Sequence, residues 1–262
     1  MAEILSIHSM GKKRHRSRKP DPGRQTKILT LSDLPKRVAV ARRKELVVRK
    51  QAVLRKTVLL RPKVFAEHVK NGAWKGRRCF IIGGGPSAKG LDLDRLQGEL
   101  TIGINRAYEL LSPTILFGVD GQLFGWAELG KLGEESKAKF NAYKGFKVWM
   151  ALHKMYPPDI YLIDPDESDG YRIGTTKRLA YKNNSGYGAI NLAAALGANP
   201  IYLIGFDMQG DKQGHQKWWH DGYPVDYGEG IYARYIEEFN HFAPVLKEAG
   251  VEVVNLNKKS AL

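Results

Sequence analysis

The sequence predicts an α/β fold, with a Rossmann-like, mainly parallel sheet covered by helices on both faces and preceded by a basic N-terminal helical arm. Two observations predict the sheet: short, continuous apolar runs recur from residue 78 to residue 255, and helical stretches separate several of them. A third observation, the uneven placement of charge, predicts the arm. We therefore expect a basic arm over residues 1–63 and a nucleotide-binding domain over residues 64–262.

Nearly all of the excess positive charge belongs to the first part of the chain. Residues 1–63 hold 19 Lys and Arg against 4 Asp and Glu, whereas residues 64–262 hold 23 of each, and the formal net charge is +15. Residues 11–27 are basic and interrupted by Pro and Gly, which predicts disorder, and residues 35–60 show the pattern of a basic amphipathic helix that ends at Pro62. Such an arm predicts a polyanionic partner. We expect nucleic acid first, with an anionic membrane, a polysaccharide or docking on the body as alternatives.

Seven apolar runs of four or five residues predict the strands of the domain. They cover residues 78–82, 100–104, 115–119, 147–150, 160–163, 201–205 and 252–255. Two helices are expected between or before the last runs, one over 186–197 that ends at Gly197 and one over 229–249 that ends at Gly250. Continuous apolar strands that alternate with helices are typical of a parallel sheet buried on both faces.

Composition excludes several classes of protein. Hydrophobic residues make up 43% of the chain, which is enough for a buried core and too many for a disordered protein. The single cysteine, Cys79, excludes a disulfide framework and a cysteine-rich zinc site. We find no signal-peptide pattern and no apolar run long enough to span a membrane, so we expect a cytoplasmic protein.

A glycine-rich loop follows the first strand and is the main candidate for a ligand site. A strand, a glycine turn and the start of a helix together place backbone N–H groups and a helix dipole toward an anion. Ser87 can cap that helix and donate to a phosphate oxygen. The alternative is a tight strand-to-helix turn without a ligand, although consecutive glycines carry an entropic cost that a plain turn does not require. We expect a nucleotide phosphate to bind the residues Gly83, Gly84, Gly85, Pro86 and Ser87.

The loop does not identify the nucleotide. The spacing Gly83-x-Gly85-x-x-Ala88 formally matches the dinucleotide fingerprint, but that fingerprint expects an acidic residue at the end of the second strand. Asn105 follows that strand instead, which weakens an NAD or FAD assignment. No Gly-Lys-Ser/Thr sequence follows the glycines, so the loop is not a Walker motif.

Four segments, taken in order, resemble a known group of proteins. They are Ile82–Ser87, Gly103–Arg106, Asn184–Gly186 at the start of a helix, and Ile201–Asp207. This series resembles the bacterial CMP-sialic acid-dependent sialyltransferases. It is also similar to the MptE-like superfamily, which contains 6-hydroxymethylpterin pyrophosphokinases and flagellin-modifying glycosyltransferase-like proteins, and uncharacterised bacteriophage proteins often share the pattern. The resemblance covers about residues 76–262 and leaves the arm unexplained.

The sialyltransferase resemblance implies where a donor binds. The loop from Gly83 to Ser87 would bind the phosphate and sugar of the donor nucleotide. Asn105 would hydrogen-bond the nucleotide, because an amide offers both a donor and an acceptor to a base or ribose edge. Ser185 and Gly186 would lie at a helix N-terminus that faces the donor, where negative charge is favoured.

The same resemblance implies a histidine general base after the strand that ends in Gly-Phe-Asp. Two histidines fit, His215 and His220, and an imidazole suits proton abstraction near neutral pH. We favour His220, because the adjacent Asp221 can orient it, with His215 as the alternative. Trp218 and Trp219 in the same loop can stack on a sugar or a base, or can simply pack on the body.

Two aspartates end predicted strands and complete the candidate site. Asp120 follows the third strand and Asp207 the sixth, at the edge where open α/β sheets bind ligands. Either carboxylate can bind Mg²⁺ between phosphates, cap a helix or orient a loop. We count Asp120 among the catalytic candidates and Asp207 among the donor-binding ones.

Three functions follow from these features. The first is a transferase that uses a nucleotide-activated donor, foremost a glycosyltransferase that uses a CMP- or UDP-type nucleotide sugar, a hydroxyl acceptor and a histidine base, without a bound metal. The second is an ATP-dependent pyrophosphokinase of the MptE-like type, for which we expect Mg²⁺. The third is a non-enzymatic, nucleic-acid-binding accessory protein that retains a nucleotide fold.

Overall fold

The computed structural model describes residues 62–153, 156–166, 168, 170–212, 215–225 and 230–262. The chain divides into two units, Met1–Leu60 and Arg61–Leu262, and all described residues belong to the second. The predicted disorder over 11–27 and the predicted helix over 35–60 therefore lie outside the described residues.

The domain is built on a nine-stranded sheet in which every strand pairing is parallel. The strand order is β1-β6-β5-β4-β3-β2-β8-β9, and β7 pairs with β6 off this path. The strands are β1 (Lys63–Val64), β2 (Cys79–Ile82), β3 (Leu100–Ile104), β4 (Ile115–Gly118), β5 (Phe146–Met150), β6 (Ile160–Pro165), β7 (Arg178–Leu179), β8 (Ile201–Ile204) and β9 (Val253–Asn255). This confirms the predicted α/β class with a parallel sheet.

All seven predicted strands are present, and two short strands are additional. Lys63, which we assigned to the arm, begins β1 and pairs with Tyr161 of β6. In β7, Arg178 pairs with Asp164 at the end of β6. Both added strands are two residues long, too short for any periodicity to reveal them.

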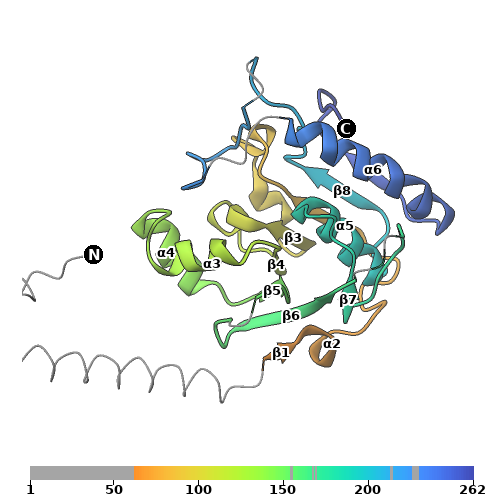
Figure 1. The fold of residues 1–262 in the computed structure, drawn as a ribbon, viewed down its shortest axis with the longest axis horizontal. Coiled ribbons are helices and arrows are strands. Elements are labelled where there is room, and N and C mark those ends of the chain that lie inside the picture. The colour runs from red at the N-terminus through yellow and green to blue at the C-terminus, as the bar shows by residue number, and fades with distance from the viewer. Residues whose placement is uncertain (1–61, 154–155, 167, 169, 213–214, 226–229) are drawn as a thin grey trace, which may run out of the picture. The chain divides into compact units, whose positions relative to one another are not determined.

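Helices cover both faces of the sheet (Figure 1). The helices α5 (Ser185–Ala195) and α6 (Ile231–Glu248) pack together on one face, and they match the two predicted helices. On the other face lie α3 (Gly121–Glu128) and α4 (Glu134–Ala142), which pack against each other. Short helical segments complete the fold: α2 (Phe65–His68), η2 (Pro86–Ala88), η3 (Leu93–Leu96) and η4 (Asn105–Glu109).

The alternation of side chains along each strand explains the two-sided core. On β4, Ile115 and Phe117 belong to the large core cluster with α5 and α6, whereas Leu116 belongs to the cluster with α3 and α4. On β5, Val148 faces the first cluster and Trp149 the second. Because each central strand is buried on both faces, its sequence is a continuous apolar run rather than an alternating one.

The order of the strands reverses beside β2. The chain runs from β2 outward through β3, β4, β5 and β6, and then returns through α5 to β8 on the other side of β2. The carboxyl ends of β2 and β8 therefore flank the point where successive connections change direction. In open α/β sheets such a point forms the usual ligand crevice.

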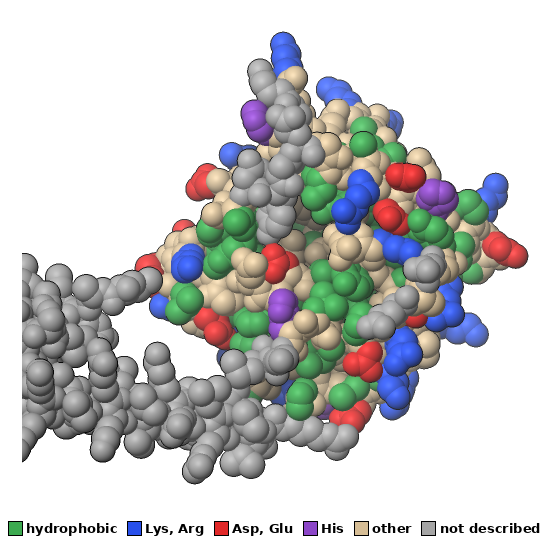
Figure 2. Space-filling view, viewed as in Figure 1, with side chains coloured by type: hydrophobic (Ala, Val, Ile, Leu, Met, Phe, Trp, Pro, Cys, Tyr) green, Lys and Arg blue, Asp and Glu red, His purple; other side chains and the backbone are tan. Residues whose placement is uncertain are grey.

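The surface of the domain has no strong charge bias on the face shown in Figure 2, where basic and acidic side chains are interspersed. This agrees with the equal counts of basic and acidic residues after residue 63. Among the described residues, no helix is long and apolar enough to cross a membrane.

Candidate functional site

A cavity of about 210 Å³ opens at the carboxyl edge of the sheet. Four strands contribute the segments that immediately follow or end them: Gly83–Gly85 after β2, Ile104–Asn105 at β3, Val119–Asp120 after β4 and Gly205–Met208 after β8. The predicted site residues Asn105, Asp120 and Asp207 are thus brought to one cavity, together with the three glycines.

Strained backbone is concentrated around this cavity. Four non-glycine residues in the described part of the domain have positive φ angles, and three of them, Asn105 (55°), Asn183 (53°) and Met208 (51°), line the cavity. A left-handed conformation costs a non-glycine residue free energy and persists where its surroundings determine it, commonly at functional sites. Residues in this conformation therefore gather at the cavity.

Most amides of the glycine loop already have protein acceptors. The Gly83 amide donates to the Ile204 carbonyl at 2.8 Å, and the Gly85 amide donates to the Gly205 carbonyl at 2.8 Å. The Ser87 amide lies 3.3 Å from both carboxylate oxygens of Asp207, and the Ser87 hydroxyl donates to Oδ2 at 2.8 Å. Of the amides in this loop, that of Gly84 has no acceptor among the described residues. The loop amides are therefore bound mainly by the end of β8 and the segment that follows it.

Close packing explains why two of these positions are glycine. A Cβ on Gly83 would lie 2.7 Å from the Gly205 carbonyl oxygen, and one on Gly85 would overlap the Asp207 carboxylate and lie 2.6 Å from the same carbonyl. The alternative of a tight turn therefore accounts for Gly83 and Gly85 without a ligand. At Gly84 a Cβ would meet Trp218 Cδ1 at 3.2 Å, so the tryptophan packs directly on the loop.

The helix expected after the glycine loop is absent. Only the three-residue 3₁₀ segment η2 follows, with Gly85 as its N-cap and no side-chain cap. Three residues provide no helix dipole of consequence for an anion. Pro86 and Ser87 are also not among the residues that line the cavity, whereas Gly83, Gly84 and Gly85 are.

Asp207 and Asp120 differ in their surroundings, although both line the cavity. Asp207 is 7% exposed, and its carboxylate accepts from Ser87 and from Asn257 Nδ2 at 3.0 Å. Asp120 is partly exposed and caps α3, accepting from the Gln122 amide at 2.8 Å. Asp207 thus joins the segments after β2, β8 and β9, whereas Asp120 caps α3 and is the more exposed of the two residues.

Two buried amide atoms on cavity-lining residues have no partner among the described residues. They are the oxygen Oδ1 of Asn105 and the nitrogen Nδ2 of Asn184. Asn184 uses its other atom, Oδ1, to cap α5 by accepting from the amides of Gly186 and Tyr187 at 2.8 and 3.2 Å. Buried polar atoms are nearly always hydrogen-bonded, so an unpaired acceptor and an unpaired donor on two residues that line the cavity require an explanation.

The N-terminus of α5 borders the cavity as the sequence suggested. Ser185 and Gly186 both line it, and the Ser185 hydroxyl has no hydrogen-bond partner in the described part of the chain. Gly186 is constrained by packing, because a Cβ there would lie 2.9 Å from Phe206 Cε1. With 11 residues, α5 is long enough to present a positive dipole end to the cavity.

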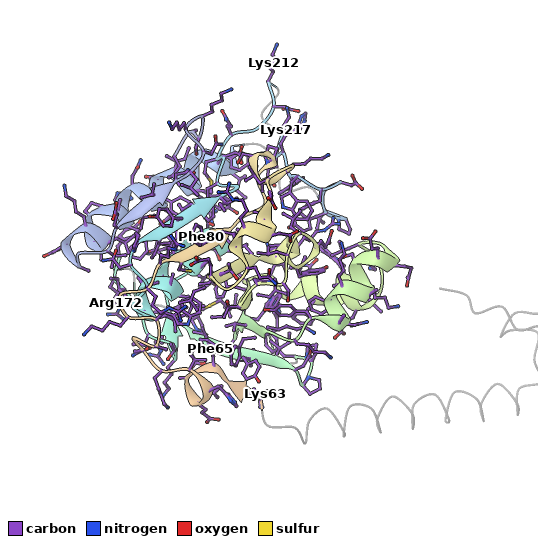
Figure 3. All side chains as sticks on the ribbon, turned by 180° about the vertical axis from the view of Figure 1, so that it is seen from behind. Lys63, Phe65, Phe80, Arg172, Lys212 and Lys217 are labelled. Carbon is purple, nitrogen blue, oxygen red and sulfur yellow. The ribbon has the colours of Figure 1, made fainter. Side chains whose placement is uncertain are left out.

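A segment after β8 forms the outer wall of the cavity, and we call its residues 215–225 the roof segment. Gln216, Lys217, Trp218 and Tyr223 of this segment line the cavity. Figure 3 shows Lys217 at one end of the domain and Lys63 with Phe65 at the opposite end. Trp218 and Tyr223 lie edge to face with ring centroids 5.3 Å apart, and Tyr223 also neighbours Trp126 of α3 at 6.2 Å. The roof segment therefore supplies aromatic surface through Trp218 and Tyr223, whereas Trp219 packs on the body against the cluster of Ala88, Leu93 and Ile204.

His220 packs behind that surface and does not line the cavity. Its ring is stacked on Trp218 at 5.8 Å and lies edge-on to Tyr223 at 4.8 Å. Its Nδ1 lies 3.0 Å from the Gly222 amide and 3.3 Å from Arg106 Nη1, while Nε2 is buried without a partner among the described residues. Burial, and then the nearby Arg106 charge, lower the pKa of His220 to about 3. Because Nδ1 faces two donors, it is the unprotonated nitrogen of the ring, and these donors already occupy its lone pair. This geometry does not suit a general base.

His215 is exposed and also lies off the cavity lining. Its Nδ1 is 3.2 Å from Asp211 Oδ2, and its amide donates to Asp211 Oδ1 at 2.9 Å. Neither predicted histidine therefore reaches the cavity in this structure.

Two tyrosines at the cavity escaped the sequence analysis. Tyr232 and Tyr235 are three residues apart at the start of α6 and both line the cavity. Burial raises the pKa of each hydroxyl, so both stay protonated and able to donate. Their spacing on one face of a predicted helix was visible, but it is equally typical of a helix that packs on a core.

The described residues contain no group of three or more His, Cys, Asp or Glu side chains that could bind a metal ion. Asp120 and Asp207 line one cavity without forming such a group.

Comparison with known proteins gives a structural likeness. No family model and no curated protein matches the sequence. Two solved structures are similar, both of the sialyltransferase CstII from Campylobacter jejuni. The complex with cytidine-5'-monophosphate has a TM-score of 0.42 and 16% identity and covers 71% of this chain and 82% of its own. The complex with CMP-3FNeuAc has a TM-score of 0.32 and 18% identity and covers 71% and 88%. Over 71% of its length, the chain is thus similar in structure to a sialyltransferase.

Proposed function

We propose that this protein is a transferase that takes a glycosyl group from a nucleotide sugar and transfers it to a hydroxyl acceptor. The observation that carries the proposal is the cavity itself. It lies at the carboxyl edge of a parallel sheet beside the reversal of strand order, and it is lined by Asn105 and Asn184, each with one buried amide atom that lacks a partner among the described residues.

The nucleotide of the donor would bind between the end of β3 and the start of α5. The free acceptor of Asn105 and the free donor of Asn184 are complementary to the edge of a base or a ribose. The Ser185 hydroxyl and the N-terminal end of α5 would face the phosphate. These residues replace the glycine loop as the main anion contact, since most amides of that loop have protein acceptors.

The phosphate would further receive hydrogen bonds from the roof side of the cavity. Lys217 is the sole Lys or Arg among the described residues that line the cavity, and Tyr232 and Tyr235 add two protonated hydroxyls. One lysine and two hydroxyls suit a donor with one phosphate better than a triphosphate, which in such sites is usually neutralised with a metal ion. We therefore favour a CMP-type donor over ATP.

Asp120 is the general base in this proposal, in place of His220 or His215. Of the three predicted catalytic residues, Asp120 is the one that lines the cavity, where Leu123 and Trp126 contribute apolar surface. The acceptor hydroxyl would give its proton to the Asp120 carboxylate while its oxygen forms a bond to the anomeric carbon. The bond from that carbon to the phosphate oxygen breaks, and the nucleotide phosphate leaves with the electron pair.

The ligand class is tested by a thermal-shift panel on the full chain with CMP, UDP, GDP and ATP, each with and without Mg²⁺. The proposal expects CMP, or next UDP, to raise the melting temperature without metal. Stabilisation by ATP only with Mg²⁺ would support the pyrophosphokinase alternative instead. No response to any nucleotide would contradict the donor site and favour the accessory-protein alternative.

We also propose that the N-terminal arm binds nucleic acid, on the ground that the net charge of +15 arises before residue 64. Contacts of Lys and Arg with phosphates weaken steeply with salt and depend little on sequence. Deletion of residues 1–60, which leaves β1 intact, is expected to abolish salt-sensitive DNA binding without a change in nucleotide stabilisation. Unchanged DNA binding would exclude the arm as the binding element.

A further inference from the structure

A buried arginine connects the roof segment to the body of the domain. Arg106 directly follows Asn105 at the end of β3 and is 8% exposed. Its guanidinium group donates to the Gly222 carbonyl at 2.9 Å through Nη1, and the same nitrogen lies 3.3 Å from His220 Nδ1. Both partners belong to the roof segment, more than 110 residues further along the chain.

The other side of the guanidinium group is bound to the body. Arg106 Nε donates to Glu109 Oε1 at 2.6 Å, and Nη2 donates to Oε2 at 2.9 Å, which forms a two-pronged ion pair. Glu109 in turn accepts from the Ser136 hydroxyl at 2.7 Å, and Ser136 is bonded to Tyr108 at 2.7 Å. Through Glu109 the guanidinium group is therefore also bound to η4 and α4.

Aromatic packing connects the Arg106 contacts to the cavity. His220, which Arg106 contacts, is stacked on Trp218 and meets Tyr223 edge-on, and both of those rings line the cavity. A second attachment lies close by, where the Trp219 amide donates to the Gly84 carbonyl at 3.1 Å. Loss of the Arg106 contacts would leave this second bond as the main link of the roof segment to the strand ends.

Burial of an arginine with its carboxylate contributes little net stability, because desolvation of both groups offsets their attraction. What a buried two-pronged pair provides is fixed geometry, and a lysine cannot reproduce it because an ammonium group lacks the planar fork. A group of this kind is expected where the position of a neighbouring segment matters.

We infer that Arg106 is a positioning residue that holds the roof segment over the cavity and, through His220, sets where Trp218 and Tyr223 meet the ligand. The consequence for ligand binding rests on the proposed function, because it requires the cavity to be where the nucleotide binds. The consequence for the roof segment does not, and the two are measured separately.

The first measurement is amide hydrogen exchange of the full chain, followed for peptides that cover residues 218–223. In Arg106→Gln and Arg106→Lys these amides are expected to exchange at least about tenfold faster than in the wild type, while peptides from β3 and β4 keep their protection. The matched control is Arg78→Gln, which removes an exposed two-pronged pair with Glu99 at the amino edge of the sheet. It should leave the roof segment unchanged.

If Arg106 variants fail to fold, Glu109→Gln serves in their place, because it releases the guanidinium group from the body but keeps a side chain of similar shape. Unchanged exchange of residues 218–223 in the folded variants would overturn the inference, whatever the protein binds.

The second measurement is the affinity for CMP, taken in a double-mutant cycle with Trp218→Ala. Arg106→Lys should weaken CMP binding by about tenfold in the wild-type background and by less than twofold in the Trp218→Ala background, because its effect passes through the aromatic wall. Equal losses in both backgrounds would show a merely structural role and contradict the inference. Failure of the wild type to bind CMP, with the exchange result as expected, would reject the proposed donor and leave the positioning role standing.

Discussion

An aspartate follows both β4 and β8 at the carboxyl edge of the sheet, but the two aspartates have different surroundings. Asp120 follows β4 and Asp207 follows β8, both at the carboxyl edge and both lining the cavity. Around Asp207, Ser87 and Asn257 direct their donors at the carboxylate, which is 7% exposed. Around Asp120, the Gln122 amide in the first turn of α3 donates to the carboxylate, and the residue remains partly exposed.

This difference shows that position at a strand end does not decide the role of a carboxylate. Donors that converge from distant segments turn Asp207 into a structural junction between the segments after β2, β8 and β9. A carboxylate that keeps accessible surface beside an apolar wall, as Asp120 does, can accept a proton from a substrate. Substitutions at the two positions should therefore separate activity from stability.

The largest effect is expected at Asp120. Asp120→Asn should lower the rate of glycosyl transfer from a CMP-sugar by about 10²- to 10⁴-fold, because the amide cannot accept the acceptor proton. Its melting temperature should change little, because an asparagine oxygen still caps α3. The rate is measured as CMP release with and without an alcohol acceptor.

Asp92→Asn is the matched control, because Asp92 is an exposed aspartate that also precedes a helical segment but accepts no capping bond. It should keep full activity. Full activity in Asp120→Asn would show that Asp120 is not the general base and would contradict the different roles that we assign to Asp120 and Asp207.

The next effect is expected at Asp207. Asp207→Ala should lower the free energy of unfolding by about 2–4 kcal/mol, because the Ser87 amide and hydroxyl and the Asn257 amide lose their acceptor in a buried place. Denaturant unfolding measures this loss. Asp207→Asn keeps one acceptor oxygen and should lose less than half as much; equal stability of all three proteins would contradict a structural role.

Much of the fold could be predicted from the sequence, because buried parallel strands are continuous apolar runs. Of the five α-helices in the described residues, α5 and α6 were predicted, whereas α2, α3 and α4 were missed for local reasons. The helix α2 is only four residues long. Gly121 and Gly125 lie within α3, and α4 has few apolar residues, so neither has a clear helical pattern.

The site could be predicted only in part, because its contacts join residues far apart in the chain. The glycine loop signals an anion site by local pattern alone, but its Ser87 meets Asp207 at a separation of 120 residues. His220 has the right chemistry for a base in sequence, and only the fold reveals that Arg106 and Gly222 engage its nitrogen. A sequence shows which side chains can act as a base or bind a phosphate, but it does not show which other residues already hydrogen-bond to them.

A smaller effect distinguishes packing from ligand contact in the glycine loop. Gly85→Ala should lower the free energy of unfolding by about 1–3 kcal/mol, since its Cβ would overlap the Asp207 carboxylate. Gly84→Ala faces only Trp218 at 3.2 Å and should cost less than about 1 kcal/mol. Thermal denaturation of the two variants decides this; a more damaging Gly84→Ala would reverse our account of the loop.

The last effect concerns pH. The pKa of His220 is lowered from 6.5 to about 3, so the unfolded chain binds a proton below pH 6.5 that the folded chain does not. Its contribution to stability is therefore complete above pH 6.5 and is lost as the pH falls toward 3, with a slope that approaches about 1.4 kcal/mol per pH unit. Denaturant unfolding between pH 4.5 and pH 7.5 should show a shallower slope for His220→Gln than for the wild type. Identical slopes would mean that His220 titrates normally and is open to solvent.

The central claim is that the cavity at the carboxyl edge binds the nucleotide of the donor. A crystal structure of the full chain soaked with CMP tests it most directly. The account predicts CMP with its base or ribose on Asn105 and Asn184 and its phosphate near Ser185, Tyr232 and Tyr235. Nucleotide bound outside this cavity, or an empty cavity at CMP concentrations that saturate the protein in solution, would contradict it.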